Sequence, residues 1–448
     1  MSMTPPGEYR ADGAKLRHST TTLIATRARW PAGPTAWLWH RRGCHAEALA
    51  LLDAAGITFA SLRLRAAFAL DLNATVVELL RGRGVRGWRI AARGLSRLAL
   101  GDTGAAQADL AETLAGPADL GLWLRAAASL CILDPGHVRR TLEPRPEAPA
   151  RLLLAHLAVQ AGDADRAEQR LAGLPRTAEM DLLAANIAVL RGDSAGPAIA
   201  RVFARKDAPV AHGPLVSVVV AAHDAERTIG AALESLAMQS WRNLEILVVD
   251  DASGDATASR AEAAATRDPR FRVLRQAVNQ GAYAARNAGI AAASGDFIAF
   301  HDADDIAHPE RIARQMAPLL EDEYLAFTTA RWVRRDANGI FRCRQVAPLV
   351  RLHVGSMLIR RSFLAAVGDF DPVRFGADND LLLRLKVAAG AGRHEALSAP
   401  LTIGGFDPRS AVHDPATGYG LRGFSRARQE YRETRTLRLI AELRQGMS

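Results

Sequence analysis

Residues 216–222 read VSVVVAA and residues 244–250 read LEILVVD, two short apolar runs rich in β-branched side chains. Such runs predict strands that are buried on both faces of a parallel sheet. Two further strands and three amphipathic helices are expected around them, at 271–275, 297–301, about 226–239, 256–266 and 282–293. Strands that alternate with helices at these intervals indicate βαβ crossovers, so the sequence predicts an α/β fold with helices on both faces of a parallel sheet.

Acidic residues follow three of the four predicted strands. The first strand leads into Asp224 and Glu226, the second ends in Asp250-Asp251, and the fourth runs through His301 into DADD at 302–305. One carboxylate after a strand is often only a helix N-cap. Because open α/β sheets bind ligands beyond the carboxyl ends of their strands, three such clusters predict a ligand site there.

The Asp-x-Asp pair of this last cluster points to a cation. Asp302 and Asp304 occupy alternate positions at a strand terminus. One or two carboxylates together with phosphate oxygens can hold a hard divalent cation, which neutralises a diphosphate both for binding and for departure. The pair therefore predicts a metal site for a sugar-nucleotide diphosphate. Asp305 is expected to act instead as the N-cap of a helix that begins near Pro309.

Residues 216–255 and 279–305 together resemble the catalytic domain of family 2 glycosyltransferases, which has the Rossmann-like GT-A fold. The strand-end Asp pair, the Arg-Asn-x-Gly helix and the Gly-Asp before the last strand occur in the expected order and spacing. The resemblance is dense over 214–317 and looser to about Pro400. It implies an α/β GT-A domain at 213–410.

The resemblance also implies roles for individual residues. Carboxylates should surround the donor nucleoside, and a glycine, an arginine and an asparagine should flank the pyrophosphate or sugar. The first group is Asp224, Glu226, Asp250 and Asp251, and the second is Gly281, Arg286 and Asn287. Asp302 and Asp304 should bind Mg²⁺ or Mn²⁺, with Asp302 also at the donor. His301 departs from the usual apolar residue and is expected to pack against the sheet, with metal ligation as the alternative.

The stretch FGADNDLLLRLKVAAG at 375–390 resembles the acceptor-side motif of the same family. An inverting transfer needs a general base that takes the proton of the acceptor hydroxyl, and Asp378 aligns with that role. Many relatives carry a Glu-Asp doublet where this chain has Ala377-Asp378, so Asp380 remains a rival. Either carboxylate could instead only stabilise the helix N-terminus.

The chain before the catalytic segment has a different character. Residues 1–36 predict a loose tail, and 37–207 predict helices throughout, because Ala and Leu recur at helical spacing. Helix breakers return about every 30 residues, at Gly43, 71–73, 101–102, 134–136, 162–163 and 192–193. This period resembles degenerate tetratricopeptide repeats, with an ordinary helical bundle as the alternative.

The linker KDAPVAHGP at 206–214 separates two segments whose patterns imply independent cores, so the chain from about Ala208 is expected to fold alone. Residues 411–448 predict a helical tail. Its basic amphipathic helix at 423–445 is expected to pack on the catalytic domain, and a contact with a membrane surface stays open.

The composition narrows the possible partners. The 448 residues carry a formal charge of +9, but the arginines are scattered, which does not favour nucleic acid. Cys44, Cys131 and Cys343 lie too far apart for a zinc or disulfide framework. His353 and His413 are interpreted as structural histidines rather than third metal ligands. No apolar run is long enough to span a membrane, so we expect a cytoplasmic protein with at most peripheral contact at the inner face of the membrane.

These observations predict a metal-dependent inverting glycosyltransferase. It would transfer a hexosyl or N-acetylhexosaminyl group from a UDP-linked donor to a glycan or lipid-linked acceptor during synthesis of a bacterial-type surface polysaccharide or glycoconjugate. The helical segment would bind the acceptor or a partner protein. One alternative is a helical-repeat scaffold with an inactive glycosyltransferase-like domain. A nucleotidyltransferase is a further alternative, but no Gly-rich, Lys-containing loop precedes the first helix of the α/β segment.

Overall fold

The computed structural model describes residues 36, 40, 44–56, 59–82, 85–116, 120–203, 209–343, 347–390, 392–405, 418–420 and 423–445. Of the tail expected at 1–36, all but Ala36 lies outside these residues, as do Gly43 and His413. Within them, no helix is both long and apolar enough to cross a membrane.

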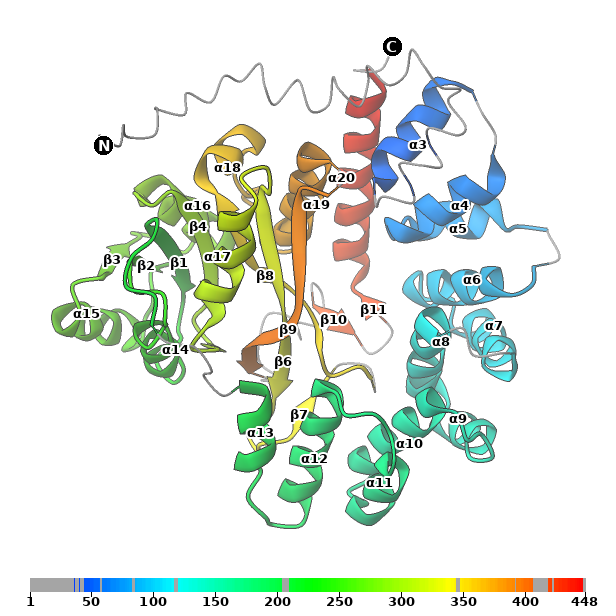
Figure 1. Cartoon of the computed structure of the whole chain (residues 1–448). Helices are drawn as coiled ribbons and strands as arrows, with labels where there is room; N and C mark the ends of the chain where they lie inside the picture. The colour runs from blue at the N-terminus through cyan, green and yellow to red at the C-terminus, as the bar shows by residue number, and fades with distance from the viewer. Residues whose placement is uncertain are drawn as a thin grey trace, which may run out of the picture.

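The N-terminal segment is helical, as predicted, and its helices form an arc beside the sheet (Figure 1). The helices are α3 (His45–Ala54), α4 (Ala60–Ala69), α5 (Asn73–Leu79), α6 (Trp88–Ala99), α7 (Thr103–Ala115), α8 (Leu120–Leu133), α9 (Pro135–Leu142), α10 (Ala148–Gln160), α11 (Ala164–Leu171), α12 (Ala178–Leu190) and α13 (Gly196–Phe203). Each described breaker of the sequence falls between two consecutive helices, from α4–α5 to α12–α13.

The Gly-Asp breakers work by a shared local mechanism. Gly101 and Gly162 have φ of +88° and +76°, the left-handed conformation that ends a helix. The aspartate that follows each glycine then caps the next helix, because Asp102 accepts a hydrogen bond from the Ala105 N–H and Asp163 accepts one from Arg166. One dipeptide therefore ends one helix and starts another, which explains its recurrence along the segment.

The second half of the chain forms one mixed sheet with the order β3-β2-β1-β4-β8-β6-β9-β5, and β7 pairs with β6. The strands are β1 (Val216–Ala222), β2 (Leu244–Asp250), β3 (Phe271–Arg275), β4 (Phe297–Asp302), β5 (Asp305–Ala307), β6 (Phe327–Arg335), β7 (Phe341–Arg342), β8 (Arg351–Arg360) and β9 (His394–Gly405). A separate pair joins β10 (Tyr419–Gly420) to β11 (Gly423–Phe424). The four predicted strands are parallel to one another, whereas β8 runs antiparallel to β4.

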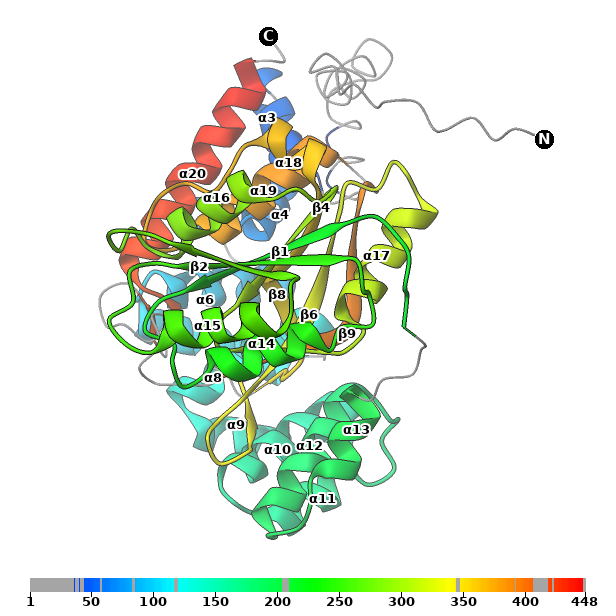
Figure 2. The same cartoon turned by 90° about the vertical axis from the view of Figure 1, so that its left-hand side faces the viewer.

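Helices cover both faces of this sheet, as predicted for an α/β fold (Figure 2). The helices are α14 (Ile229–Ala237), α15 (Thr257–Arg267), α16 (Ala282–Ala292), α17 (Arg311–Glu321), α18 (Arg361–Val367), α19 (Ala377–Ala389) and α20 (Arg426–Gln445). Alternate residues of β1 serve the two faces, because Val218 packs with α14, α15 and α17 whereas Val219 packs with α16, α18 and α19. Gly289 lets α16 approach closely, since a Cβ there would lie 2.3 Å from Cγ1 of Val219.

The expectation of two independent cores is wrong, because apolar clusters cross the boundary at both ends of the helical segment. Helices α3 to α6 share a cluster with Leu383 and Val387 of α19 and Ile440 of α20. At the other end, residues of α10, α12 and α13 share a cluster with Phe341 and Leu349. A Pro/Gly linker in the sequence marks the end of a helix but carries no information about which surfaces meet afterwards.

Polar contacts reinforce the second boundary. The Asn186 amide donates to the carbonyl of Phe341 at 2.9 Å and accepts from its N–H at 2.6 Å. The Glu179 carboxylate accepts from the N–H groups of Leu349 and Val350 at 2.6 and 3.0 Å. Side chains of α12 therefore satisfy backbone groups next to β7 and β8 that would otherwise need water.

The predicted C-terminal helix is α20, and it packs on α19 as expected and on α3 as well. Arg435 of α20 pairs with Asp380 of α19 at 2.9 Å, and Arg432 pairs with Asp71 at 2.6 Å. The helix thus lies between the two halves of the chain and joins both.

Removal of residues 1–207 should expose the apolar side chains that now contact the helical segment. Burial of one Leu, Ile or Phe side chain contributes about 1.5–3 kcal/mol, and the whole domain is stable by only about 5–15 kcal/mol. We therefore expect the truncated chain to aggregate, as measured by soluble yield and gel filtration. A soluble, monomeric fragment with a melting temperature near that of the full chain would contradict the shared cores.

A matched pair on α20 tests the same boundary in the full chain. Ile440 is 6% exposed and Leu437 is 50% exposed. Ile440→Asp should lower the melting temperature strongly because it buries an unpaired charge, whereas Leu437→Asp should change it little.

Candidate functional site

The loops that follow β1 and β2 are locked to each other by reciprocal hydrogen bonds. Asp224 accepts from the Gly254 N–H at 2.9 Å, and Glu226 accepts from the Ala256 N–H at 3.1 Å. In return, the Glu226 N–H donates to Asp255 at 3.0 Å. The structure therefore brings these two predicted residues to the carboxyl edge of the sheet, with one oxygen of each carboxylate used to hold the loops.

The two aspartates at the end of β2 differ in their partners. Asp250 is buried, and its Oδ1 has no hydrogen-bond partner among the described residues. Both oxygens of Asp251 are already engaged, since they accept from the N–H groups of Gln280 and Gly281 at 2.8 and 2.7 Å. Asp250 is thus the member of the predicted pair that has an oxygen left for a ligand, and Asp251 positions the loop before α16.

Gly281 is required where it stands. Its φ of +93° favours glycine, and an added Cβ would lie 3.3 Å from Cδ of Arg374. Arg374 lies in the loop that precedes α19, and it donates a hydrogen bond to Oδ1 of Asn279 at 2.7 Å. The N-terminus of α16 is therefore held against the loop that precedes α19.

An ion pair between the buried Arg286 and the half-buried Asp302 joins α16 to the end of β4. The Arg286 guanidinium donates through Nη2 to Oδ1 of Asp302. Although burial opposes ionisation of both groups, their mutual attraction lowers the pKa of Asp302 and raises that of Arg286. Both groups therefore stay charged. Because the ion pair fixes the carboxylate of Asp302, the position of its second oxygen is fixed as well.

Asp302 shares its surroundings with Asp305 and His353. One potential ligand atom from each of these three side chains lies within 4.8 Å of the other two. Oδ2 of Asp305 and Nδ1 of His353 are buried without hydrogen-bond partners among the described residues. Burial and the neighbouring Asp304 and Asp302 raise the pKa of Asp305 well above its ordinary value.

His353 is held rigidly at this position. Its ring stacks on Trp332 at 4.4 Å with 6° between the planes. Gly355 leaves the space for the ring, because a Cβ there would lie 2.9 Å from Nε2 of His353 and 3.6 Å from Oδ2 of Asp302. Burial lowers the pKa of His353 to about 3, so its nitrogens can act as neutral ligands.

Two interpretations from the sequence change here. Asp305 does not cap a helix, because it lies in β5 and α17 begins at Arg311 after Glu310. His353, for which the sequence predicts a structural role, lies beside Asp302, while Asp304 is exposed and outside the three-residue group. No local motif surrounds His353, and it reaches the site on β8, which pairs with β4 and, at His353 itself, with β6.

His301 packs against the sheet, as expected. Its Nδ1 accepts from Arg311 at 2.8 Å, so its Nε2 carries the hydrogen donated to the Asp305 carbonyl at 3.1 Å. Burial lowers its pKa to about 3. Both nitrogens are thus committed to the structure, which argues against the alternative of metal ligation.

Asn287 was expected to flank the donor, but its side chain is occupied. Its Nδ2 donates to the Phe370 carbonyl at 2.9 Å, and its Oδ1 accepts from the Phe370 N–H at 3.0 Å. The residue therefore fixes the segment before α19 to α16 rather than facing a ligand.

The acceptor-side carboxylates are also distinguished by their partners. Asp378 is half-buried and accepts from the Tyr283 hydroxyl at 3.0 Å. Asp380 is buried and bonded by two arginines, Arg384 at 2.8 Å and Arg435 at 2.9 Å. Because Asp380 holds α19 to α20, Asp378 is the carboxylate with capacity left for a substrate proton.

One network therefore connects the two sides of the site. Asp302 bonds Arg286, whose guanidinium carbon lies 5.4 Å from the ring centre of Tyr283, and Tyr283 bonds Asp378. Carboxylates at strand ends beside the switch between β1 and β4 suit a ligand that offers hydroxyl or N–H donors, or a phosphate that is held through a cation.

Residues 217–382 match the sequence model of glycosyl transferase family 2. This family 2 segment contains every site residue described above, from Asp224 to Asp380. It also extends beyond the stretch of dense resemblance and reaches the helix that carries Asp378.

Two curated relatives and one solved structure illustrate the similarity. The chain is 46% identical over 103 residues to the succinoglycan biosynthesis protein ExoO of Rhizobium meliloti (strain 1021), which covers 23% of this chain and 29% of that protein. It is 38% identical over 108 residues to the UDP-Glc:alpha-D-GlcNAc-diphosphoundecaprenol beta-1,3-glucosyltransferase WfgD of Escherichia coli, covering 24% and 42%. S. aureus TarS 1-349 in complex with UDP aligns with a TM-score of 0.38 and 22% identity, over 51% of this chain and 64% of that one. The chain spans less than half the length of the two curated relatives.

The Asn287 contacts generate a test of the family 2 segment. Asn287→Asp cannot donate to the Phe370 carbonyl and places a charge against it, so it should destabilise the protein by about 1–3 kcal/mol. Asn279→Asp is a comparison on the neighbouring loop, where an arginine faces the side chain and the added charge should be tolerated. Thermal unfolding of both variants measures the difference. Equal melting temperatures would show that the Phe370 contacts contribute little.

Proposed function

We propose that this protein is a metal-dependent, inverting glycosyltransferase. It transfers a sugar from a nucleotide-sugar donor, which we take to be UDP-linked, to a hydroxyl of a glycan or lipid-linked acceptor. The observation that carries the proposal is the network from Asp302 through Arg286 and Tyr283 to Asp378, which joins a diphosphate-type site to a carboxylate suited to proton transfer. The family 2 match over 217–382 supports it.

The donor nucleoside is assigned to the loops after β1 and β2. The unpartnered Oδ1 of Asp250 can accept from the base or ribose, as can the remaining oxygens of Asp224 and Glu226. The name of WfgD specifies a UDP-glucose donor and that of ExoO specifies synthesis of succinoglycan. By analogy we infer a UDP-linked hexose or N-acetylhexosamine donor and a role in a bacterial-type surface polysaccharide.

The residues at the end of β4 fit a divalent cation. Two carboxylates and an imidazole converge there, and a cation would relieve the repulsion between Asp302 and Asp305. Asp302, Asp305 and His353 would hold it, with Asp304 at the exposed rim. Oxygen ligands suit Mg²⁺ or Mn²⁺, and the imidazole favours Mn²⁺. When bound, the ion would neutralise the diphosphate leaving group.

Asp378 is assigned as the general base. It takes the proton from the acceptor hydroxyl as the hydroxyl oxygen attacks the anomeric carbon from the side opposite the diphosphate. The Tyr283 hydroxyl donates to one oxygen of Asp378 and so directs the other toward the acceptor. Arg286 stays charged next to the leaving group and offsets its developing charge.

The helical pairs from α4 to α13 are assigned as tetratricopeptide-like repeats that bind the acceptor or a protein partner. We place the protein in the cytoplasm, with at most a peripheral contact at the inner membrane face.

The two alternative functions predict different reaction products. Incubation with a panel of sugar nucleotides should release nucleoside diphosphate from a glycosyltransferase, sugar 1-phosphate from a nucleotidyltransferase and neither from a scaffold with an inactive domain.

Metal dependence tests the assignment at β4. Chelation should abolish transfer and weaken donor binding, and added Mn²⁺ should restore both. In titrations of Mn²⁺ in the presence of UDP, Asp302→Asn and His353→Gln should weaken Mn²⁺ binding by about tenfold or more, since each removes a ligand. Asp304→Asn should have a smaller effect. If Asp304→Asn abolishes binding while His353→Gln does not, the Asp302–Asp304 pair alone holds the ion.

The base assignment separates binding from chemistry. Asp378→Asn should leave donor affinity nearly unchanged and reduce transfer by about 10²- to 10⁴-fold. Asp380→Asn should mainly lower the melting temperature, because it leaves Arg384 and Arg435 without their partner. Initial rates, donor titration and thermal unfolding measure the three quantities. A stable but inactive Asp380→Asn beside an active Asp378→Asn would transfer the role of base to Asp380.

A further inference from the structure

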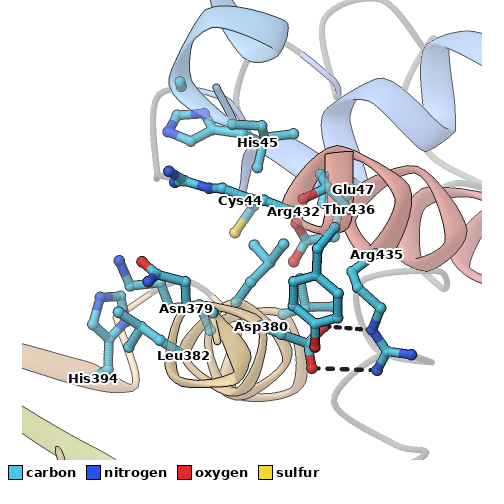
Figure 3. Close-up of a pocket in the computed structure, with 18 residues that line it drawn as sticks. Cys44, His45, Glu47, Asn379, Asp380, Leu382, His394, Arg432, Arg435 and Thr436 are labelled. Atoms are coloured by element: carbon cyan, nitrogen blue, oxygen red, sulfur yellow. Dashed lines mark hydrogen bonds and ion pairs between the residues drawn. The ribbon is translucent and has the colours of Figure 1, made fainter. Parts of the chain in front are cut away.

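A second pocket lies away from the ends of β1, β2 and β4, between α3 and α4 of the helical segment and α19 and α20 of the catalytic half (Figure 3). Its volume is about 290 Å³. That is close to the lower limit for small-molecule sites, roughly 300 Å³. The pocket therefore suits a small ligand.

The polar groups around this pocket are mainly basic. They are Lys386 and Asn379 of α19, His394 of β9, His45 of α3 and Arg432 of α20. Figure 3 shows His45 and Arg432 on one wall and Asn379 and His394 on the other. Because the walls come from both halves of the chain, a ligand between them would contact both.

Lys386 is the main basic side chain of the pocket. It is half-buried, and among the described residues it forms no ion pair or hydrogen bond. Burial and the nearby Arg432 lower its pKa. Lys386 also contributes to the lowered pKa values of His45 and His394, which burial depresses first. Arg432 therefore makes the charging of Lys386 less favourable, and Lys386 makes the charging of the two histidines less favourable.

Arg432 is paired with Asp71, but among the described residues the carboxylates that line the pocket do not pair with Lys386. Asp380 is bonded by Arg384 and Arg435. Burial raises the pKa of Glu47 to about 7, so a large part of it is neutral at that pH. A buried cation without a partner is costly, and an anion with several oxygen acceptors would remove the cost.

We propose that this pocket binds a small ligand through a phosphate or carboxylate group that contacts Lys386. Lys386 and Asn379 donate to the anionic oxygens from α19, and His45 of α3 and Arg432 of α20 face them from the opposite wall. The ligand is either a free anion or the charged group of a larger sugar compound. The site does not depend on the transferase activity, so it can be tested with the resting full-length protein.

The position of the pocket connects it to the base. Gly376 and Asn379 line the pocket and flank Asp378 in the chain. A bound anion would hold the first turn of α19 against the helical segment.

Inorganic phosphate is the first probe, titrated calorimetrically at an ionic strength held constant with chloride. Lys386→Met should weaken its binding by about tenfold or more, as expected when a charge-assisted hydrogen bond is lost. Arg260→Met is the matched control, because it removes the same charge from an exposed position on α15. If Lys386→Met does not fold, His394→Phe replaces it, since this ring can keep its stacking on Phe327 while losing its nitrogens.

A hexose phosphate and a hexuronic acid then distinguish the source. Tighter binding of either sugar compound than of phosphate identifies the anion as part of a sugar ligand, and equal or weaker binding identifies a free anion. Either result supports the site, provided that the Lys386→Met variant no longer binds the probe. Absence of binding to all three probes, or binding that Lys386→Met leaves unchanged, overturns the proposal.

The scarcity of lysine offers a second measurement. The chain has only Lys15, Lys206 and Lys386, so an amine-acetylating reagent reports on three side chains, two of them internal controls. Saturating phosphate should slow acetylation of Lys386 on the order of tenfold, by the same contact, and leave Lys15 and Lys206 unaffected. Equal rates at Lys386 with and without phosphate would contradict a direct contact.

Discussion

The ion pair of Arg286 and Asp302 is the interaction on which the rest of the site depends. Taking the charge of Arg286 out of water is costly unless it is matched closely, and the half-buried Asp302 is its main partner. The pair fixes α16 relative to the end of β4. Through the same helix it fixes Tyr283, and through Tyr283 the carboxylate of Asp378. One ion pair thereby determines the relative position of groups that lie on separate elements.

The contacts of α16 explain the spacing of the motif Arg-Asn-x-Gly. Arg286 faces the end of β4, Asn287 holds the backbone of Phe370, and Gly289 allows contact with Val219 of β1. The three residues fix three sides of one helix. Their spacing is what a single helix needs to contact a strand end, a loop and a sheet face at once.

The sequence predicted the elements whose signals are local. The β-branched runs gave the four parallel strands within a residue, and the Gly-Asp dipeptides marked the turns between helices because the glycine and the cap act on their immediate neighbours. What could not be predicted depends on distant pairing. His353 reaches Asp302 through an antiparallel strand, and Asn287 is occupied by a residue 83 positions away.

The attachment of the helical arc at both of its ends has a mechanical consequence. A helical-repeat array with free ends can bend, because each repeat contacts only its neighbours and small rotations add up along its length. Here α3 is fastened to α20 and α12 to the strand that follows β6, so the end-to-end distance of the arc is set by the catalytic half. Any change in the curvature of the arc must therefore apply force to α19 and α20 at one end and to β7 at the other. Because both ends of the arc are attached, its resistance to bending depends on the domain that carries Asp378.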